Sequence, residues 1–150
     1  DVIVSLSLKR TIPVNPEVKD KAMKRIFTGA PSEDAAGYAK AVIAGTTIYV
    51  SGTTGRDPKT NAFPDDASQQ TRNALSSIDN ALLAAGASLS DAVASRVYIT
   101  NRNDANAVSL VLGEIFRDIR PTSTFLICEI PIPGAKVEIE ITASLVGKTG

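Results

Sequence analysis

The chain has 150 residues, of which 43% are hydrophobic and 21% charged, as expected of one soluble globular domain with its own core. It carries 16 Lys and Arg against 16 Asp and Glu, so no net basic charge is available to attract nucleic acid. It contains no histidine and one cysteine, which excludes a Ser-His-Asp triad, a Cys-His dyad, His-containing metal sites and intrachain disulfides.

These counts favour a cytoplasmic protein that uses neither a metal nor a cofactor. A reducing compartment suits a chain without disulfides, and no apolar run approaches the roughly 20 residues of a membrane span. The glycines form no GxGxxG or GxxxxGK[ST] nucleotide loop. The chain starts at Asp1 rather than Met, so a trimmed N-terminus and a removed targeting segment both stay open.

The N-terminal third of the chain is expected to contain strands and loops. Residues 2–8 alternate apolar and polar side chains in part, which indicates a strand, and the proline-containing charged stretch after them is expected to be a loop. Residues 26–42 read as a strand start followed by a loop rich in Gly, Pro, Ser and Asp. The β-branched residues of 46–52 predict a strand that ends at Gly52.

Two amphipathic helices are predicted in the second half of the chain. Residues 68–85 place apolar side chains at i, i+3 and i+4 spacing, and Gly86 stands where a left-handed cap belongs. Residues 104–118 repeat the pattern, with Asp104 as the expected N-cap.

Three further strands are predicted around these helices, at residues 91–100, 122–130 and 136–145. The first should place Val93, Val97 and Ile99 on one face. Cys128 is expected to be a small buried hydrophobe of the second strand. The third should bury the side chains of Val137, Ile139 and Ile141 on one face. The opposite face should then carry Glu138, Glu140 and Thr142.

This order of elements predicts an α+β fold, with two helices packed on one face of a mixed sheet. The opposite, more polar face must be solvated or covered by another subunit. We divide the chain into an N-terminal extension, residues 1–25, and one domain, residues 26–150.

Two glutamates on the last strand are candidates for acid–base chemistry. Glu138 and Glu140 share a face about 6 to 7 Å apart, because alternate residues of a strand point to the same side. If both side chains are exposed, they only make this face of the sheet polar toward the solvent. Covered by a partner, one of them would have a raised pKa and could serve as a general acid or base. The loop residue Tyr38 is open to a surface role or a pocket role.

Five segments in order make the chain resemble the RidA/YjgF family, also called the endoribonuclease L-PSP family. They are GYAKAV, IYVSGTTGRDPKT, QQTRNALSSIDNALLAAGASLSDAV, SRVYITNRND and RPTSTFLICEIPIPGAKVEIEITA, and together they span about residues 26–146. The resemblance implies a chorismate-mutase-like α+β domain, a homotrimer with clefts between subunits, and a small-molecule substrate. It also implies hydrolysis of reactive enamines or imines to 2-keto acids and ammonia.

The resemblance also implies a set of site residues and two departures from the family pattern, at Ser123 and at Ser109, the position nearest to the cleft asparagine of the imine-deaminating branch. Glu138 stands at the position of the family's acid–base glutamate and is the expected catalytic residue. Ser123 stands where the imine-deaminating branch has the arginine that binds the substrate carboxylate. Arg120 is a candidate replacement for that cation, and Phe125 offers a backbone N–H to an anionic oxygen. The expected substrate-binding residues are Tyr38, Ser109, Ser123, Thr124, Phe125 and Arg120.

Because Ser123 cannot supply a positive charge, we expect an enamine, imine or related C–N substrate other than the usual 2-aminoacrylate type. Two alternatives stay open. The first is a non-catalytic trimer that binds or senses a small molecule. The second is an endoribonuclease, which the absence of histidine, the zero net charge and the 5% of aromatic residues disfavour.

Overall fold

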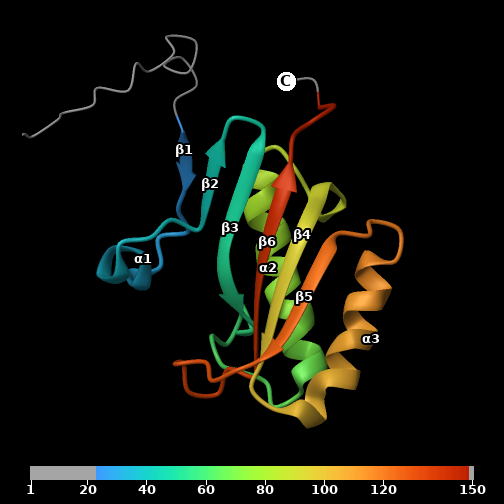
Figure 1. Cartoon of the computed structure of the whole chain (residues 1–150). Coiled ribbons are helices and arrows are strands. Elements are labelled where there is room, and N and C mark those ends of the chain that lie inside the picture. Colours follow the sequence, from blue (N-terminus) through green and yellow to red (C-terminus); the bar gives the residue numbers. More distant parts are fainter. Residues whose placement is uncertain (1–22, 149–150) are drawn as a thin grey trace, which may run out of the picture.

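One sheet of six strands organises the part of the chain that the computed structural model describes, residues 23–148 (Figure 1). The strand order is β1-β2-β3-β6-β4-β5; β4 and β5 run parallel, and every other neighbouring pair is antiparallel. The strands are β1 Lys24–Ile26, β2 Ala41–Ala44, β3 Thr47–Thr54, β4 Ala92–Ile99, β5 Thr122–Ile127 and β6 Val137–Ser144. The strand predicted at residues 2–8 lies outside the described residues.

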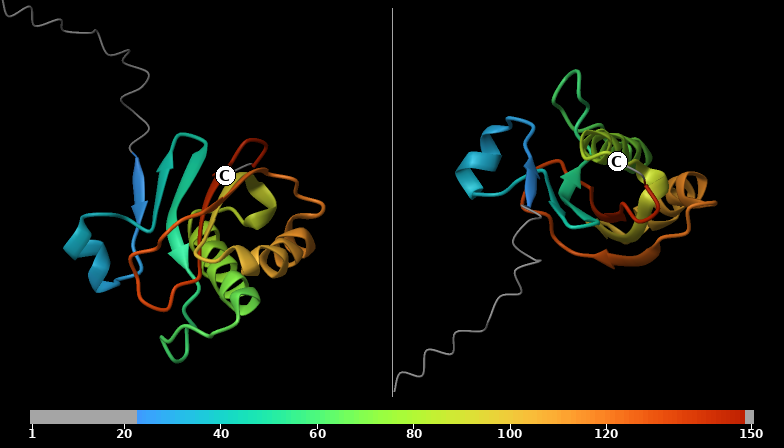
Figure 2. Two further views of the ribbon diagram at one scale, coloured as in Figure 1. Left: turned by 60° about the horizontal axis from the view of Figure 1, so that its bottom comes forward. Right: turned by 90° about the horizontal axis from the view of Figure 1, so that it is seen from above.

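Two long helices lie on one side of this sheet, which confirms the predicted α+β fold. Helix α2, Ala67–Ala84, runs along β3 and β6, and α3, Ala105–Phe116, packs beside α2 (Figures 1 and 2). The short helix α1, Pro31–Ala36, lies beyond the β1–β2 end of the sheet. Within residues 23–148, no helix is both long and apolar enough to cross a membrane.

The ends of the helices follow local capping chemistry. The Asp66 side chain accepts a hydrogen bond from the backbone N–H of Ser68 at 3.0 Å, which starts α2, and Gly86 follows the helix with a φ of 81°. Asp104 precedes α3 as predicted, but its side chain makes no capping hydrogen bond. Asn101 acts instead, accepting from the Asn103 backbone N–H at 2.9 Å at the start of a 3₁₀ turn, because the turn and not α3 opens this segment.

The core lies between α2 and the sheet, and β6 provides its centre. Val137 and Ile139 are fully buried and Ile141 is 1% exposed, while the residues between them are only half-buried, so the alternation predicted for this strand is confirmed. From α2, the side chains of Leu75, Ile78 and Leu82 cover this apolar face.

Three local predictions are wrong. Ile26 does end a strand, but the loop predicted after it is interrupted by α1 and ends at β2, because Pro31 suits the first helical turn although a six-residue helix is too short to show a periodicity. Val93 is exposed, since the register between β4 and β6 shifts between Ala92 and Ala94. Cys128 is also exposed: it comes just after β5, an edge strand whose side chains are mostly uncovered.

Candidate functional site

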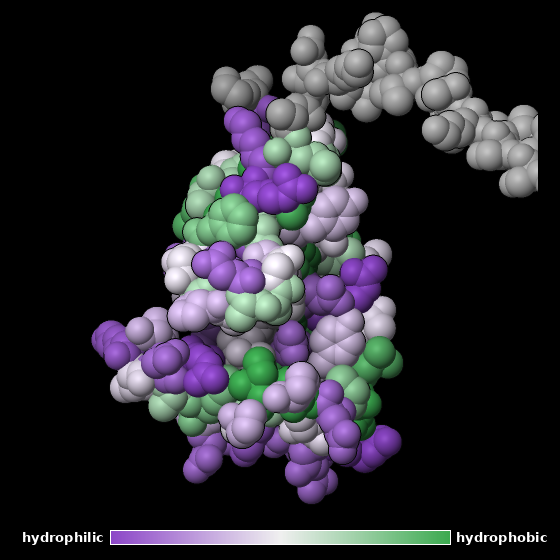
Figure 3. Space-filling model, turned by 90° about the vertical axis from the view of Figure 1, so that its left-hand side faces the viewer, coloured by the Kyte–Doolittle hydropathy of each residue, from purple (hydrophilic) through white to green (hydrophobic). Residues whose placement is uncertain are grey.

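A hollow in the described part of the molecule lies where β3 runs on past the end of its partner β2. The pairing of these strands ends at Ala41 with Val50 and one further hydrogen bond, from the Ser51 backbone N–H to the Lys40 carbonyl at 2.9 Å. Beyond it the chain leaves β2 toward α1, so residues 52–54 continue past the end of β2. The hollow surrounds this segment and is lined mainly by α1, Lys40 just before β2, β3, α2 and Glu138 of β6. Figure 3 shows the side of the molecule that carries α1, where polar and apolar side chains alternate around a depression.

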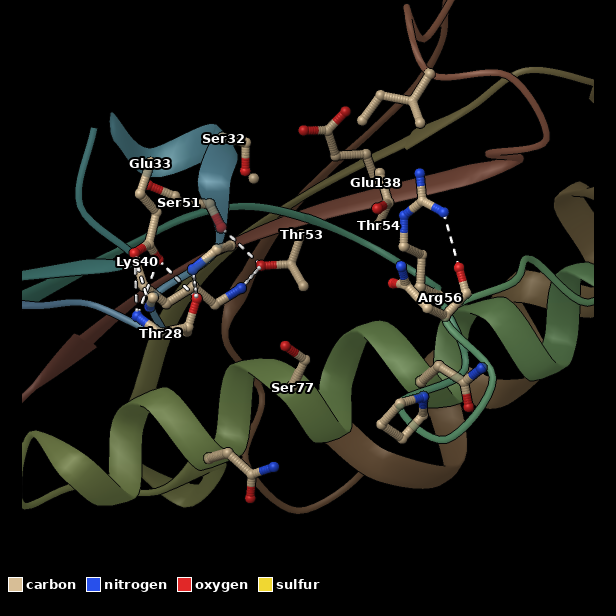
Figure 4. A pocket seen from close by; sticks show the side chains of 18 of the residues that line it. Thr28, Ser32, Glu33, Lys40, Ser51, Thr53, Thr54, Arg56, Ser77 and Glu138 are labelled. Atoms are coloured by element: carbon tan, nitrogen blue, oxygen red, sulfur yellow. Dashed lines mark hydrogen bonds between the residues drawn. The ribbon is translucent and has the colours of Figure 1, made fainter. Parts of the chain in front are cut away.

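On the face of the sheet that points away from α2, the hollow contains Glu138. Its cross-strand neighbours are Thr54 on β3 and Tyr98 on β4. The side chain lies over Gly52: a Cβ at that glycine would come within 2.3 Å of the Glu138 Oε1. Figure 4 shows Glu138 on the far side of the strands from α2. A glycine at position 52 therefore leaves the space that this carboxyl occupies.

The surroundings of Glu138 favour its neutral form. Partial burial raises the pKa of the Glu138 carboxyl above its usual range, and the nearby charge of Glu140 raises it further. Glu140 itself accepts a hydrogen bond from the Tyr98 hydroxyl at 2.5 Å, and this bond raises the pKa of Tyr98. The Glu138 carboxyl therefore exchanges protons at a pH closer to neutral than a solvated carboxyl does, as a general acid or base requires.

On the side that faces α2, the same stretch of β3 contacts a buried lysine. Lys40 is 9% exposed, and its Nζ donates a hydrogen bond to Thr53 Oγ1 at 2.5 Å. The Thr53 hydroxyl in turn donates to the Ser51 carbonyl at 2.8 Å. Burial lowers the pKa of Lys40 to about 8, although the charge of Glu33 acts in the opposite direction. Figure 4 shows Lys40 and Thr53 above α2, with Ser77 pointing toward the same space.

Helix α1 and the loop just after it contribute a carboxylate and a phenol to the lining of the hollow. The Glu33 carboxylate accepts hydrogen bonds from the backbone N–H groups of Thr28 and Gly29 and from the Thr28 hydroxyl, at 2.8 to 3.1 Å. These bonds, that of the Thr28 backbone first, hold the pKa of Glu33 below its usual range. Tyr38 is 39% exposed, and its hydroxyl lies 2.8 Å from the Ser32 hydroxyl. Tyr38 and Glu138 thus line one hollow, as two of the predicted site residues.

Two other predicted site residues line a second, separate hollow. Ser123 and Arg120 lie there with Pro121, between the start of β5 and the end of α3. Arg120 has a φ of 55°, in the left-handed region, at the point where the chain turns into β5. Within one chain, these two residues therefore do not meet Glu138.

The remaining predicted residues line neither hollow. Thr124 is an exposed residue of β5, opposite Arg96 of β4. Phe125 is half-buried and packs its ring against the core. Ser109 is an exposed residue of α3.

The sequence reasoning did not select Lys40, Thr53 or Glu33. A usable signal was present in α2, where four polar residues with short side chains fall at helical spacing and face the hollow: Asn73, Ser76, Ser77 and Asn80. Such a stripe marks a helix face that meets a polar space rather than the core. Among the described residues, no three His, Cys, Asp or Glu side chains gather in a way that could hold a metal ion.

Comparison with known proteins identifies relatives over most of the chain. The family model described as endoribonuclease L-PSP matches residues 28–145. A RutC family protein of Sulfurisphaera tokodaii is 34% identical over 81% of this chain and 98% of its own length. A protein of Capra hircus named 2-iminobutanoate/2-iminopropanoate deaminase is 32% identical over 81% of this chain and 90% of its own length.

Solved structures of relatives also match most of the chain. Rv2704 of Mycobacterium tuberculosis, described as a member of the YjgF/YER057c/UK114 family, is 35% identical over 82% of this chain and 99% of its own, with a TM-score of 0.74. Escherichia coli TdcF, solved with bound serine, is 29% identical over 71% of this chain and 87% of its own, with a TM-score of 0.66.

Proposed function

Because the chain belongs to the RidA/YjgF (endoribonuclease L-PSP) family, we propose that it hydrolyses an enamine, imine or related C–N compound in a cleft between subunits. The substrate class follows from the relatives named as iminobutanoate and iminopropanoate deaminases. The substrate itself is a compound other than the usual 2-aminoacrylate type, since Ser123 stands where the carboxylate-binding arginine is expected.

The observation that carries the proposal is the position of Glu138 in the hollow, half-buried and with a raised pKa. Hydrolysis of an imine consumes one water and releases ammonia and a carbonyl compound. Water adds to the imine carbon, and the nitrogen must gain a proton before it leaves. The Glu138 carboxyl, whose raised pKa lets it keep its proton to a higher pH than a solvated carboxyl, donates that proton, and the resulting carboxylate accepts one from water or from the carbinolamine hydroxyl.

The arrangement of the two hollows supports a site formed by two copies of the chain. Glu138 and Tyr38 line one hollow, while Ser123 and Arg120 line the other. The strand β5, which has no further neighbour among the described residues, also leaves the large apolar side chains of Leu126 and Ile127 50% and 46% exposed. In the homotrimer that we propose, β5 of one subunit covers the Glu138 face of the next.

Ammonia release from imines generated in situ by an amino-acid oxidase tests the proposal. We expect Glu138→Gln to lower the rate by about 100-fold or more, since it removes the proton donor and keeps the shape. The matched control is Glu114→Gln, on the exposed face of α3, which should retain the wild-type rate.

Substrate choice is tested with Ser123→Arg. This variant should gain activity on imines of small 2-oxo acids, on which the wild type is weak. Equal activity of the wild type and Glu138→Gln across a panel of charged and neutral imines would overturn the proposal. Binding of such compounds without turnover would instead show a non-catalytic binding protein.

A further inference from the structure

Lys40 lies on the side of β3 opposite to Glu138, and the proposed hydrolysis gives it no role. We infer that Lys40 is a nucleophilic amine that forms a covalent imine with a small, uncharged aldehyde or ketone entering the hollow from the α2 side. This second site goes beyond the proposed function, since it requires no C–N hydrolysis.

The geometry around Nζ favours a reactive amine over a structural ion pair. The ion pairs within 4 Å in the described chain are Arg72–Glu114 and Lys148–Asp91, so no carboxylate holds Lys40 at that distance. The Glu33 carboxylate is occupied by Thr28 and Gly29. The partner of Nζ is the Thr53 hydroxyl, which leaves other positions of the amine available to a ligand.

Burial supplies the activation that a lysine needs at neutral pH. A freely solvated lysine has a pKa of about 10.4 and is almost wholly protonated at pH 8. Lys40 is 9% exposed, and burial lowers its pKa to about 8, so about half of the chains carry the neutral amine at that pH. The other ionisable groups of the hollow are Glu33, which raises the pKa of Lys40, and Tyr38, Arg56, Asp57 and Glu138.

The space in front of the amine suits a small polar molecule. Ser77 and Asn80 of α2 line the hollow and offer a hydroxyl and an amide group to a carbonyl oxygen, whereas the amide of Asn73 already bonds to the Gly55 carbonyl and to Gln69. The charge of Glu33 near Lys40 works against a carboxylate in the same place, which favours a neutral aldehyde or ketone over a 2-oxo acid.

The step balances without any other reactant. The Nζ lone pair forms a bond to the carbonyl carbon, and a proton passes from nitrogen to the carbonyl oxygen to give a carbinolamine. The Thr53 hydroxyl, bonded to Nζ and to the Ser51 carbonyl, is placed to carry that proton. Loss of water then forms the C=N bond.

Reductive trapping tests this inference. The full chain is treated with propanal and borohydride for short times at pH 8, and the modified lysines are identified by peptide mass spectrometry. The neutral fraction of an amine with pKa 8 exceeds that of a solvated lysine on the order of 100-fold at this pH, so Lys40 should be modified at least about tenfold faster than the exposed Lys24. Equal initial rates at Lys40 and Lys24, or no modification of Lys40, would overturn the inference. Because the wild-type chain gives this answer, it does not depend on a variant that folds.

Three variants and one second probe sharpen the result. Lys40→Gln should lose the fast modification, and Lys24→Gln should keep it. Thr53→Val should slow the modification of Lys40 several-fold by removing the proton carrier, and an unchanged rate would exclude that role of the hydroxyl. Glyoxylate, a charged aldehyde, should modify Lys40 more slowly relative to Lys24 than propanal does. The reverse order would overturn the preference for an uncharged ligand.

Discussion

The two sides of β3 at residues 51–54 meet different surroundings, although they belong to the same few residues. On the α2 side the chain touches the buried amine of Lys40, and just after it Gly55 packs against the backbone of α2; on the other side the chain touches the half-buried carboxyl of Glu138. Desolvation acts on both groups and moves their pKa values in opposite directions, down for Lys40 and up for Glu138. Burial therefore moves the pKa values of an acid and a base toward neutral pH within one hollow.

The two sides also differ in how far the atoms that face each glycine can move aside. A Cβ at Gly55 would lie 2.2 to 2.5 Å from backbone atoms of Gln70 in α2, and a Cβ at Gly52 would meet only the end of the Glu138 side chain. Gln70 is itself fixed, since its amide donates to the carbonyls of Pro64 and Gly134 and accepts from the Lys136 backbone N–H, at 2.7 to 2.9 Å. The contact of Gly55 with α2 is therefore rigid, and the Glu138 side is adaptable.

The largest expected effect is the loss of stability caused by Gly55→Ala, with Gly52→Ala as its comparison. Gly55→Ala should lower the free energy of unfolding by about 3 kcal/mol or more, because the backbone of α2 cannot move aside. Gly52→Ala should cost less than about 1 kcal/mol and still abolish any activity of Glu138, whose carboxyl it displaces. Denaturant unfolding measures both. Similar losses of stability in the two variants would contradict the difference between the two sides.

The second effect is a dependence of stability on alkaline pH that comes from Lys40. Between its folded pKa of about 8 and its unfolded value of about 10.4, the unfolded chain binds more protons, so the free energy of unfolding rises with pH. One pKa unit corresponds to about 1.36 kcal/mol, so the gain is at most about 3 kcal/mol.

Chemical denaturation at pH 8 and pH 9.5 measures this gain, with Lys40→Met as the comparison. The variant should lose most of the rise, while Lys24→Met should keep it. A rise of equal size in the Lys40 variant would assign it to other groups.

Much of the fold was predictable from the sequence because its main elements have clear periodicities. In α2 and β6 the apolar residues recur at helix and strand spacing, and the structure buries them as expected. The sequence does not predict helix α1 because six residues are too few to show a period, and it does not predict the exposure of Cys128 because an apolar run does not reveal that its strand lies at an edge.

The site was less predictable, for a geometric reason. Alternation on β6 indicated that Glu138 and Glu140 share a face, and the loop residue Tyr38 was a candidate from its resemblance to the family. The role of Lys40 could not be predicted from the sequence, because the burial of its side chain depends on β3 continuing past the end of β2 and on α2 lying beneath. No spacing within GYAKAV carries that information.

The smallest expected effect tests the carboxyl on the adaptable side. Because the folded pKa of Glu138 is raised, the stability contributed by its protonated form is present below the unfolded pKa and is lost as pH rises through the folded value. At pH 7, Glu138→Gln should therefore leave the free energy of unfolding unchanged or raise it by less than about 1 kcal/mol, since partial exposure screens the charge. The same variant should lose activity, so activity and stability would respond in opposite directions. Thermal unfolding at pH 4 and pH 7 measures the difference. A clear loss of stability at pH 7 would show that the carboxylate is stabilised by contacts within the fold, and would argue against a group kept free for proton transfer.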